Sequence, residues 1–123
     1  MKQIFICFFL VTIISCTSDN EQDYFGVDCD TENVYYTSND SQKSISHIIA
    51  TKCLSCHSNE TMSVSGSWVT LETYDDLSFY LDLDEIINNV DSPMPPVLSP
   101  PLTDCEQAQI ESWVHNGFLY EEE

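Results

Sequence analysis

Residues 51–57 read TKCLSCH, a pair of cysteines two residues apart with a histidine directly after the second. Three chemistries use a C-x-x-C pair: a redox disulfide, half of a zinc site, and the two thioether bonds that attach a haem. Only haem attachment uses a histidine at this position, because its imidazole then reaches the iron from the side of the thioethers. The motif therefore predicts Cys53 and Cys56 as attachment sites and His57 as the proximal iron ligand.

The two competing chemistries lack their remaining parts in this sequence. A zinc site needs a second C-x-x-C pair or an H-x-x-x-H pair at a suitable distance, and neither is present. A thioredoxin-like pair needs a β-α-β pattern around it and would leave His57 without a role. Haem attachment is the interpretation that accounts for all three residues.

An iron with a protein ligand on each side of the porphyrin needs a second donor. Met62, five residues beyond His57, could round the porphyrin edge only under strain, at about 3.4 Å per residue. Met94 lies 37 residues beyond His57, and prolines hold its backbone extended. We expect Met94 to be the distal ligand, with His115 or His47 as the alternative ligand. If Met94 does not bind the iron, its expected role is that of a core side chain that fills a gap in the packing.

The N-terminus predicts export and a lipid anchor. The apolar run 4–14 is too short to span a bilayer and suits a secretion signal better than a buried strand or helix. Residues 13–16, Ile-Ile-Ser-Cys, resemble the lipobox of bacterial lipoproteins, which implies loss of residues 1–15 and acylation of Cys16. The acidic stretch 16–28 is expected to be a solvated tether.

The remaining cysteines predict one disulfide. Of the six, Cys7 lies in the signal, Cys16 takes lipid and two belong to the motif, which leaves Cys29 and Cys105. An even remainder in an oxidising compartment favours a Cys29–Cys105 bond over two separate buried thiols.

Charge excludes one class of partner. After the expected cleavage the chain keeps two lysines, Lys43 and Lys52, against 21 acidic residues, a formal charge of −19. Such a surface cannot neutralise phosphates, so nucleic-acid binding is excluded. The acidity serves solubility, or it steers a basic partner towards the protein.

The apolar spacing predicts about four short helices and few strands in one small domain. They are expected to begin after Ser41 or Ser44, Thr73, Asp82 and Thr103, the last with a full capping box and an end at Gly117. Residues 60–68 are expected as a loop around Gly66, residues 33–37 as an extended lead-in and residues 91–96 as an extended proline-rich segment. The expected inward-facing residues are Ile45, Ile48, Ile49 and Lys52 or Cys53; Tyr74, Leu77 and Leu81; Leu83, Ile86, Ile87 and Val90; and Ile110, Trp113 and Val114.

The order of these elements resembles the small mono-haem c-type cytochromes of bacterial envelope lipoproteins, close to the planctomycete-type cytochrome c domain group. The likeness rests on Cys53–His57, Met94-Pro95-Pro96, Leu102–Cys105 and the helix from Ile110 through Trp113 to Gly117. It implies an all-α, cytochrome c-type fold whose first and last helices cross around one covalent haem c, within residues 29–120. Where the family often has glycines near the distal methionine, this chain has Pro-Pro-Val-Leu-Ser-Pro-Pro.

The resemblance implies a membrane-tethered carrier of single electrons and not an enzyme. Burial of the haem by Ile48, Ile49, Leu71, Leu77, Ile86, Val90, Ile110 and Trp113 is expected to raise its potential. Its expected partners are electron donors and acceptors with basic surfaces. Its expected location is the bacterial envelope, lipid-anchored in the outer membrane and facing the periplasm or the outside, with an acidic tail at residues 121–123. Two alternatives stay open. One is a haem protein that binds a small gas or reduces peroxide at an open sixth position of the iron, and the other is an interaction module in which the haem only stabilises the fold.

Overall fold

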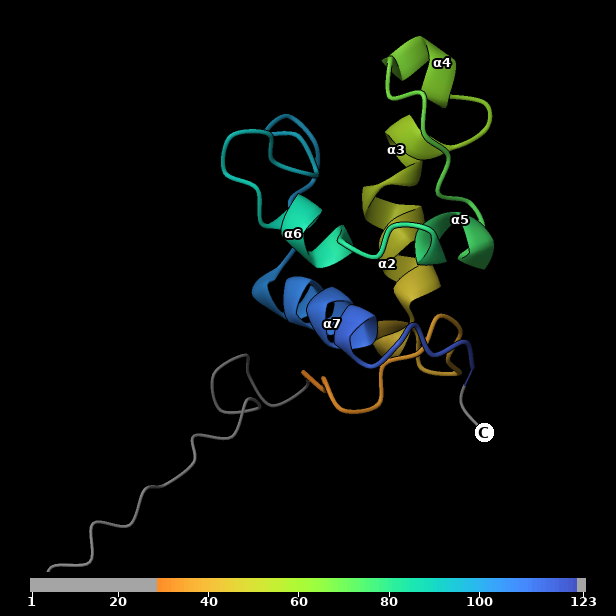
Figure 1. Ribbon diagram of the computed structural model, residues 1–123, viewed down its shortest axis with the longest axis vertical. Coiled ribbons are helices and arrows are strands. Elements are labelled where there is room, and N and C mark those ends of the chain that lie inside the picture. Colours follow the sequence, from red (N-terminus) through yellow and green to blue (C-terminus); the bar gives the residue numbers. More distant parts are fainter. Residues whose placement is uncertain (1–28, 122–123) are drawn as a thin grey trace, which may run out of the picture.

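The computed structural model describes residues 29–121 (Figure 1). The expected signal peptide, the lipid site Cys16, the tether 16–28 and tail residues 122–123 lie outside this part. The described chain contains helices but no strand, only two isolated bridges, and this confirms the all-α class. None of its helices is long and apolar enough to cross a membrane. The helices are η1 (Ser41–Lys43), α2 (Ile45–Lys52), α3 (Leu54–His57), α4 (Met62–Ser65), α5 (Tyr74–Ser78), α6 (Leu83–Ile87) and α7 (Asp104–His115).

Helix α2 begins where the sequence predicts, but its first turn is satisfied differently. Ser44 holds the N-cap position, yet its side chain makes no cap hydrogen bond and donates to the Tyr36 carbonyl instead. The backbone N–H groups of Ile45 and Ser46 donate to the carbonyls of Tyr35 and Tyr36, at 3.0 and 2.9 Å. The extended lead-in segment thus caps α2 with its own backbone.

Helix α7 is built by the capping box that the sequence predicts. The Thr103 hydroxyl accepts from the Glu106 N–H at 3.1 Å, and the Glu106 carboxylate accepts from the Thr103 N–H at 2.8 Å. At the other end Gly117 takes a φ of +83°, a left-handed conformation that glycine adopts without strain. These signals fix both ends of the longest helix in the described part.

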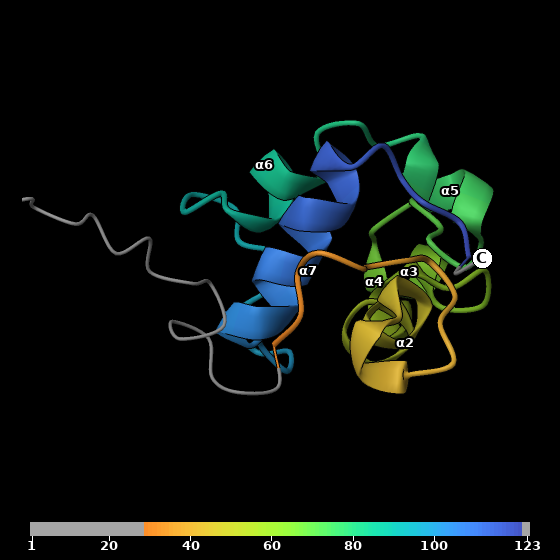
Figure 2. The ribbon, with the colours of Figure 1, turned by 90° about the horizontal axis from the view of Figure 1, so that it is seen from below.

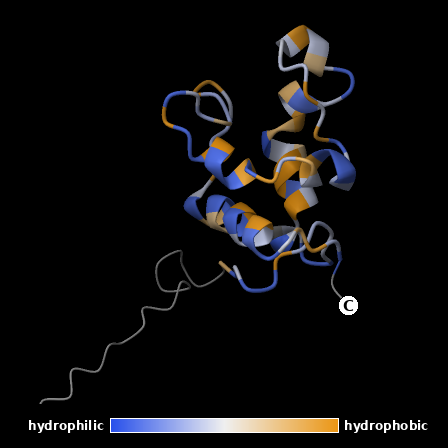
Figure 3. Ribbon diagram, viewed as in Figure 1, coloured by the Kyte–Doolittle hydropathy of each residue, from blue (hydrophilic) through white to orange (hydrophobic). Residues whose placement is uncertain are grey.

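The core forms where α2 and α7 cross and pack against each other, as two perpendicular views show (Figures 1 and 2). Both helices carry apolar segments between polar ones, as expected for helices with one buried face (Figure 3). Trp113 of α7 is fully buried, and its indole N–H donates to the Leu119 carbonyl at 2.9 Å. The buried apolar residues of this core are Val34, Ile45, Ile48, Ile49, Leu71, Leu77, Leu83, Ile110 and Trp113.

Three short helices depart from the expected pattern. Within the expected loop 60–68, residues Met62–Ser65 form α4, which ends at Gly66 with φ +77°. Helix α5 begins at the Thr73 cap but stops at Ser78, so Leu81 is 73% exposed and its predicted inward position is wrong. Helix α6 stops at Ile87, and Val90 is 90% exposed, so its predicted place against the haem is wrong as well.

The N-terminal segment of the domain is fastened along α7. The sulfurs of Cys29 and Cys105 are bonded to each other. Gln109 donates through its amide to the Asp30 carbonyl at 3.1 Å, and the Ser112 hydroxyl donates to the carbonyl of Thr31. The first described residues are therefore bonded to α7 before the chain continues into α2.

Candidate functional site: a cavity beside the C-x-x-C-H turn

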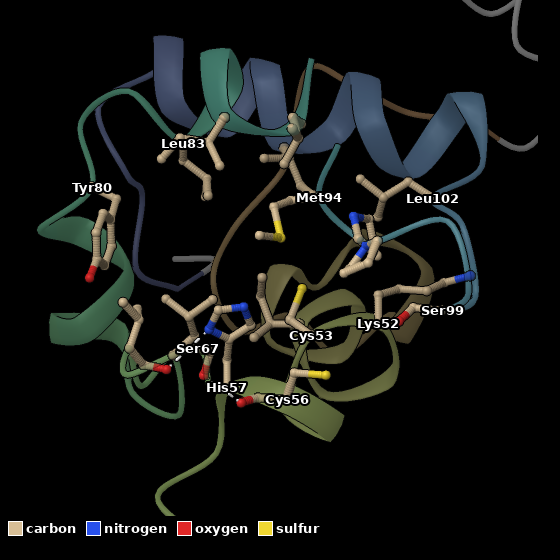
Figure 4. A pocket seen from close by; sticks show the side chains of 18 of the residues that line it. Lys52, Cys53, Cys56, His57, Ser67, Tyr80, Leu83, Met94, Ser99 and Leu102 are labelled. Atoms are coloured by element: carbon tan, nitrogen blue, oxygen red, sulfur yellow. Dashed lines mark hydrogen bonds between the residues drawn. The ribbon is translucent and has the colours of Figure 1, made fainter. Parts of the chain in front are cut away.

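A cavity of about 360 Å³ is lined by residues of α2 and α3 on one side, and by residues of α6, the loop that follows α6, and α7 on the other (Figure 4). Its volume falls in the range of small-molecule and cofactor pockets, roughly 300–1,000 Å³. Cys53, Cys56, His57 and Met94 all line it. Three residues of one motif and a methionine 37 positions away thus share a single space.

The two cysteines sit on one helical turn. Cys53 ends α2 and precedes α3, and its carbonyl accepts from the N–H groups of Cys56 and His57 at 3.1 and 3.0 Å. Residues three apart on a helix share a face, so both sulfurs can serve the same edge of a ligand. Neither cysteine is in a disulfide.

Burial raises the pKa of the Cys53 thiol to about 11, with a smaller contribution from the nearby Glu106 carboxylate. The thiol therefore stays neutral at physiological pH. A redox-active C-x-x-C pair needs the opposite, a lowered pKa that supplies thiolate. The environment of Cys53 thus argues against the thioredoxin-like interpretation.

His57 is oriented by a backbone carbonyl. Its Nδ1 lies 3.0 Å from the Val69 oxygen, which can only accept, so Nδ1 carries the proton. The lone pair is then on Nε2, the form of imidazole that binds metals, and a hydrogen bond at the other nitrogen is the usual support of such a ligand. The Leu71 N–H also donates to the His57 carbonyl at 2.9 Å. The histidine is held at both its ring and its backbone.

The loop after α4 also fixes the backbone of Cys56. The hydroxyls of Ser65 and Ser67 both donate to the Cys56 carbonyl at 2.7 Å, and Ser67 itself lines the cavity. Val69, which holds His57, belongs to the same loop. No sequence signal identifies Val69, because a backbone carbonyl can come from any residue.

Met94 reaches the cavity from the loop that follows α6, opposite the C-x-x-C-H turn. In Figure 4 its sulfur points into the cavity, towards the side where Cys53 and His57 lie. Pro95 and Pro96 follow it along the lining, and the Ser99 N–H closes a turn on the Pro96 carbonyl at 2.8 Å. The prolines thus support the position from which the thioether projects.

The other three candidates for the distal ligand do not line the cavity. His47 is exposed on α2. His115 is exposed at the end of α7, where Nδ1 donates to the Glu111 carbonyl at 2.7 Å. Met62 begins α4 and is only partly buried. Of the four donors considered from the sequence, Met94 alone faces the space beside His57.

Lys52 is the one lysine at the cavity rim. Its ammonium lies 3.2 Å from the Glu106 carboxylate and donates to the Pro101 carbonyl at 2.9 Å. It therefore ties the end of α2 to the start of α7 and to the loop that carries Met94.

The walls are mainly aliphatic. Ile49, Leu71, Ile86 and Ile110 line the cavity as expected, whereas Ile48, Leu77 and Trp113 lie in the core behind it. Five further apolar or aromatic residues line the cavity but were not among those expected around a haem: Val69, Tyr80, Leu83, Ile87 and Leu102.

The residues present fit a haem better than a bare metal ion. Within residues 29–121, no group of three or more His, Cys, Asp or Glu side chains could hold a metal. His57 and Met94 are two donors, the number that an iron needs when a porphyrin supplies four nitrogens. The aliphatic walls suit the apolar faces of a porphyrin, and the two thiols lie beside the histidine.

The chain matches no known family profile, no curated protein and no solved structure. The features that bear on a cofactor and a function are therefore the motif and the cavity that contains it.

Proposed function

We propose that this protein is a small c-type cytochrome that carries one electron at a time between redox partners of a bacterial envelope. The observation that carries the proposal is the shared cavity: Cys53, Cys56, His57 and Met94 line one apolar space of about 360 Å³. Two of these residues are thiols at thioether spacing, and two are the donors of a histidine–methionine iron site.

Each residue has a distinct role in this proposal. The thiols of Cys53 and Cys56 would hold the haem through two thioether bonds, each made by adding S–H across a vinyl double bond, so that no oxidant is consumed. His57 would bind the iron through Nε2, because the Val69 carbonyl holds the proton on Nδ1. Met94 gives a thioether ligand, which favours the reduced state relative to a second histidine. The bound haem supplies the one-electron chemistry of its iron.

The tether belongs to the same proposal. Lipid on Cys16 would hold the carrier at the membrane, and the stretch 16–28 would let the domain reach its partners. Both lie outside the described residues. The acidic surface favours partners with basic surfaces.

The first test is whether the chain takes up haem. The full chain is expressed in a host with cytochrome-assembly machinery, and we expect a gain of one haem in mass and haem staining after denaturing electrophoresis. A Cys53→Ala/Cys56→Ala variant should lose both signals. Colourless wild-type protein of bare polypeptide mass would rule the proposal out.

The second test is the iron's distal ligand. The ferric protein should show a methionine–iron charge-transfer band, and Met94→Ala should abolish the band and lower the reduction potential. Met62→Ala is the matched control, since Met62 does not line the cavity, and it should leave both unchanged. Rapid carbon monoxide binding by the reduced wild type would instead support a gas-binding haem with an open sixth position.

A further inference from the structure

The connection between α5 and α6 turns two apolar side chains outward. The Tyr80 N–H donates to the Leu77 carbonyl at 3.0 Å, and the Leu83 N–H donates to the Tyr80 carbonyl at 3.1 Å. These bonds direct Leu77 and Leu83 into the core, with Tyr80 packed against it. The residues on either side of Tyr80 are left outside: Phe79 is 80% exposed and Leu81 is 73% exposed. Two large apolar groups on one short turn, both facing water, need an explanation.

Three exposed carboxylates lie close in sequence to this apolar pair. Asp75, Asp82 and Glu85 are exposed on the same stretch of eleven residues. Among the described residues, Lys43 pairs with Asp30 and Lys52 pairs with Glu106, and both of these carboxylates lie outside this stretch. Asp82, at the N-cap of α6, makes no side-chain cap hydrogen bond. We call Phe79, Leu81, Asp75, Asp82 and Glu85 the Phe79 patch.

The Phe79 patch is connected to the cavity by direct contact. The rings of Phe79 and Tyr80 pack edge to face with centroids 5.7 Å apart. Tyr80 lines the cavity that Cys53, His57 and Met94 share (Figure 4). One aromatic pair therefore spans the distance from solvent to the space in which the proposed haem would lie.

We propose that the Phe79 patch is the docking surface for a basic redox protein, an inference that rests on the proposed electron-carrier function. An apolar centre with a charged rim is the usual anatomy of a transient interface, in which the rim steers encounter and the centre holds the complex. The acidic rim complements a positively charged partner. It repels both a second copy of this acidic chain and a membrane of anionic lipid.

The test measures electron transfer and binding separately. Haem-loaded full chain is mixed with a basic mitochondrial cytochrome c as the probe, and the second-order rate is followed by stopped flow at low and high salt. Binding to the immobilised probe is measured on the same samples. The absorption spectrum of each sample reports haem loading beforehand, so a failure of the proposed function is seen before the docking question is asked.

Two variants examine the two parts of the patch. Phe79→Ser/Leu81→Ser should lower both rate and affinity about tenfold at either salt concentration. Asp75→Asn/Asp82→Asn/Glu85→Gln should slow the reaction about tenfold at low salt, and the effect should vanish at high salt. Neither variant should change the absorption spectrum.

Matched controls remove the same chemistry elsewhere. Val97→Ser/Leu98→Ser alters two apolar residues that are 87% and 101% exposed, and Glu32→Gln/Glu60→Gln/Glu121→Gln removes three other exposed charges. Both should change the rate less than twofold. If either control variant lowered the electron-transfer rate as much as the matching patch variant, the proposal would be overturned. The rate would then depend on the apolar residues at 97–98 or on the net charge of the protein, and not on the Phe79 patch. Patch-dependent self-association in sedimentation, or patch-dependent binding to phosphatidylcholine vesicles without an effect on the probe, would also overturn it.

Discussion

Removal of the Cys29–Cys105 disulfide gives the sharpest quantitative prediction for the fold. The bond joins residues 76 positions apart, so it encloses most of the domain, including the whole C-x-x-C-H motif. In the chain-entropy account of disulfides, closing a loop of that length in the unfolded chain is worth about 4 kcal/mol. We expect a Cys29→Ala/Cys105→Ala variant to lose about that much free energy of unfolding.

The structure lets this loss be assigned to the cross-link. The neighbouring residues keep independent contacts with α7, through the bonds from Gln109 to the Asp30 carbonyl and from Ser112 to the Thr31 carbonyl. The segment should therefore stay docked in the variant, and its helical content should not change. Cys29 is 3% exposed, so alanine leaves only a small void there.

The assay is urea unfolding of the haem-loaded chain, followed by circular dichroism and compared with wild type in oxidising buffer. Thioether bonds survive reducing agents, so wild type treated with dithiothreitol serves as a second route to the same state. Both should lose roughly 3–4 kcal/mol relative to the oxidised wild type. A loss below about 1 kcal/mol in both would refute the reasoning, since it would mean that the bond constrains the unfolded chain very little.

Three smaller predictions follow from single contacts. Thr103→Ala removes the hydroxyl that caps α7 and should lower the free energy of unfolding by about 1 kcal/mol in urea titrations. Leu77→Ala, at a fully buried site, should lower it by about 3 kcal/mol, while Leu81→Ala, at a site 73% exposed, should change it by less than about 0.5 kcal/mol. Lys43 donates a hydrogen bond to Asp30 and so lowers the pKa of the Asp30 carboxyl below its ordinary value of 3.8. The Lys43–Asp30 pair therefore contributes its full stability above pH 3.8 and loses it as the pH falls through the lowered pKa. Lys43→Met should therefore cost about 0.5 kcal/mol at pH 7, and the difference from wild type should shrink in unfolding curves taken below about pH 4.

The parts of the fold that the sequence predicted well are governed by local signals. The Thr103 capping box and Gly117 act within a few residues of α7, and both ends of the helix lie where these signals place them. The isoleucine spacing of α2 likewise reflects one buried face. The motif at residues 53–57 carries its own geometry, because three residues on one turn cannot be far apart.

The wrong predictions of buried residues lie where the apolar spacing extends past the end of a helix. Leu81 and Val90 fit the spacing of α5 and α6, but α5 ends at Ser78 and α6 at Ile87. The turn from Tyr80 to Leu83 then shifts the inward positions, so that Tyr80 faces the cavity and Leu81 faces water. Where a short helix stops depends on tertiary packing, which apolar spacing does not record.

The cavity and the small hydrophobic core share several of their residues. The cavity is partly open to solvent, so anything apolar that covers its aliphatic walls stabilises the fold by roughly 25 cal/mol per Å² of apolar surface removed from water. A whole domain of this size is stable by only about 5–15 kcal/mol. Ile49, Leu71, Leu83 and Ile110 serve both the core and the cavity wall, so whatever fills the cavity completes the core. In the proposed haem protein, bonds to Cys53 and Cys56 would keep the group that fills the cavity in place, and with it the contacts that complete the core.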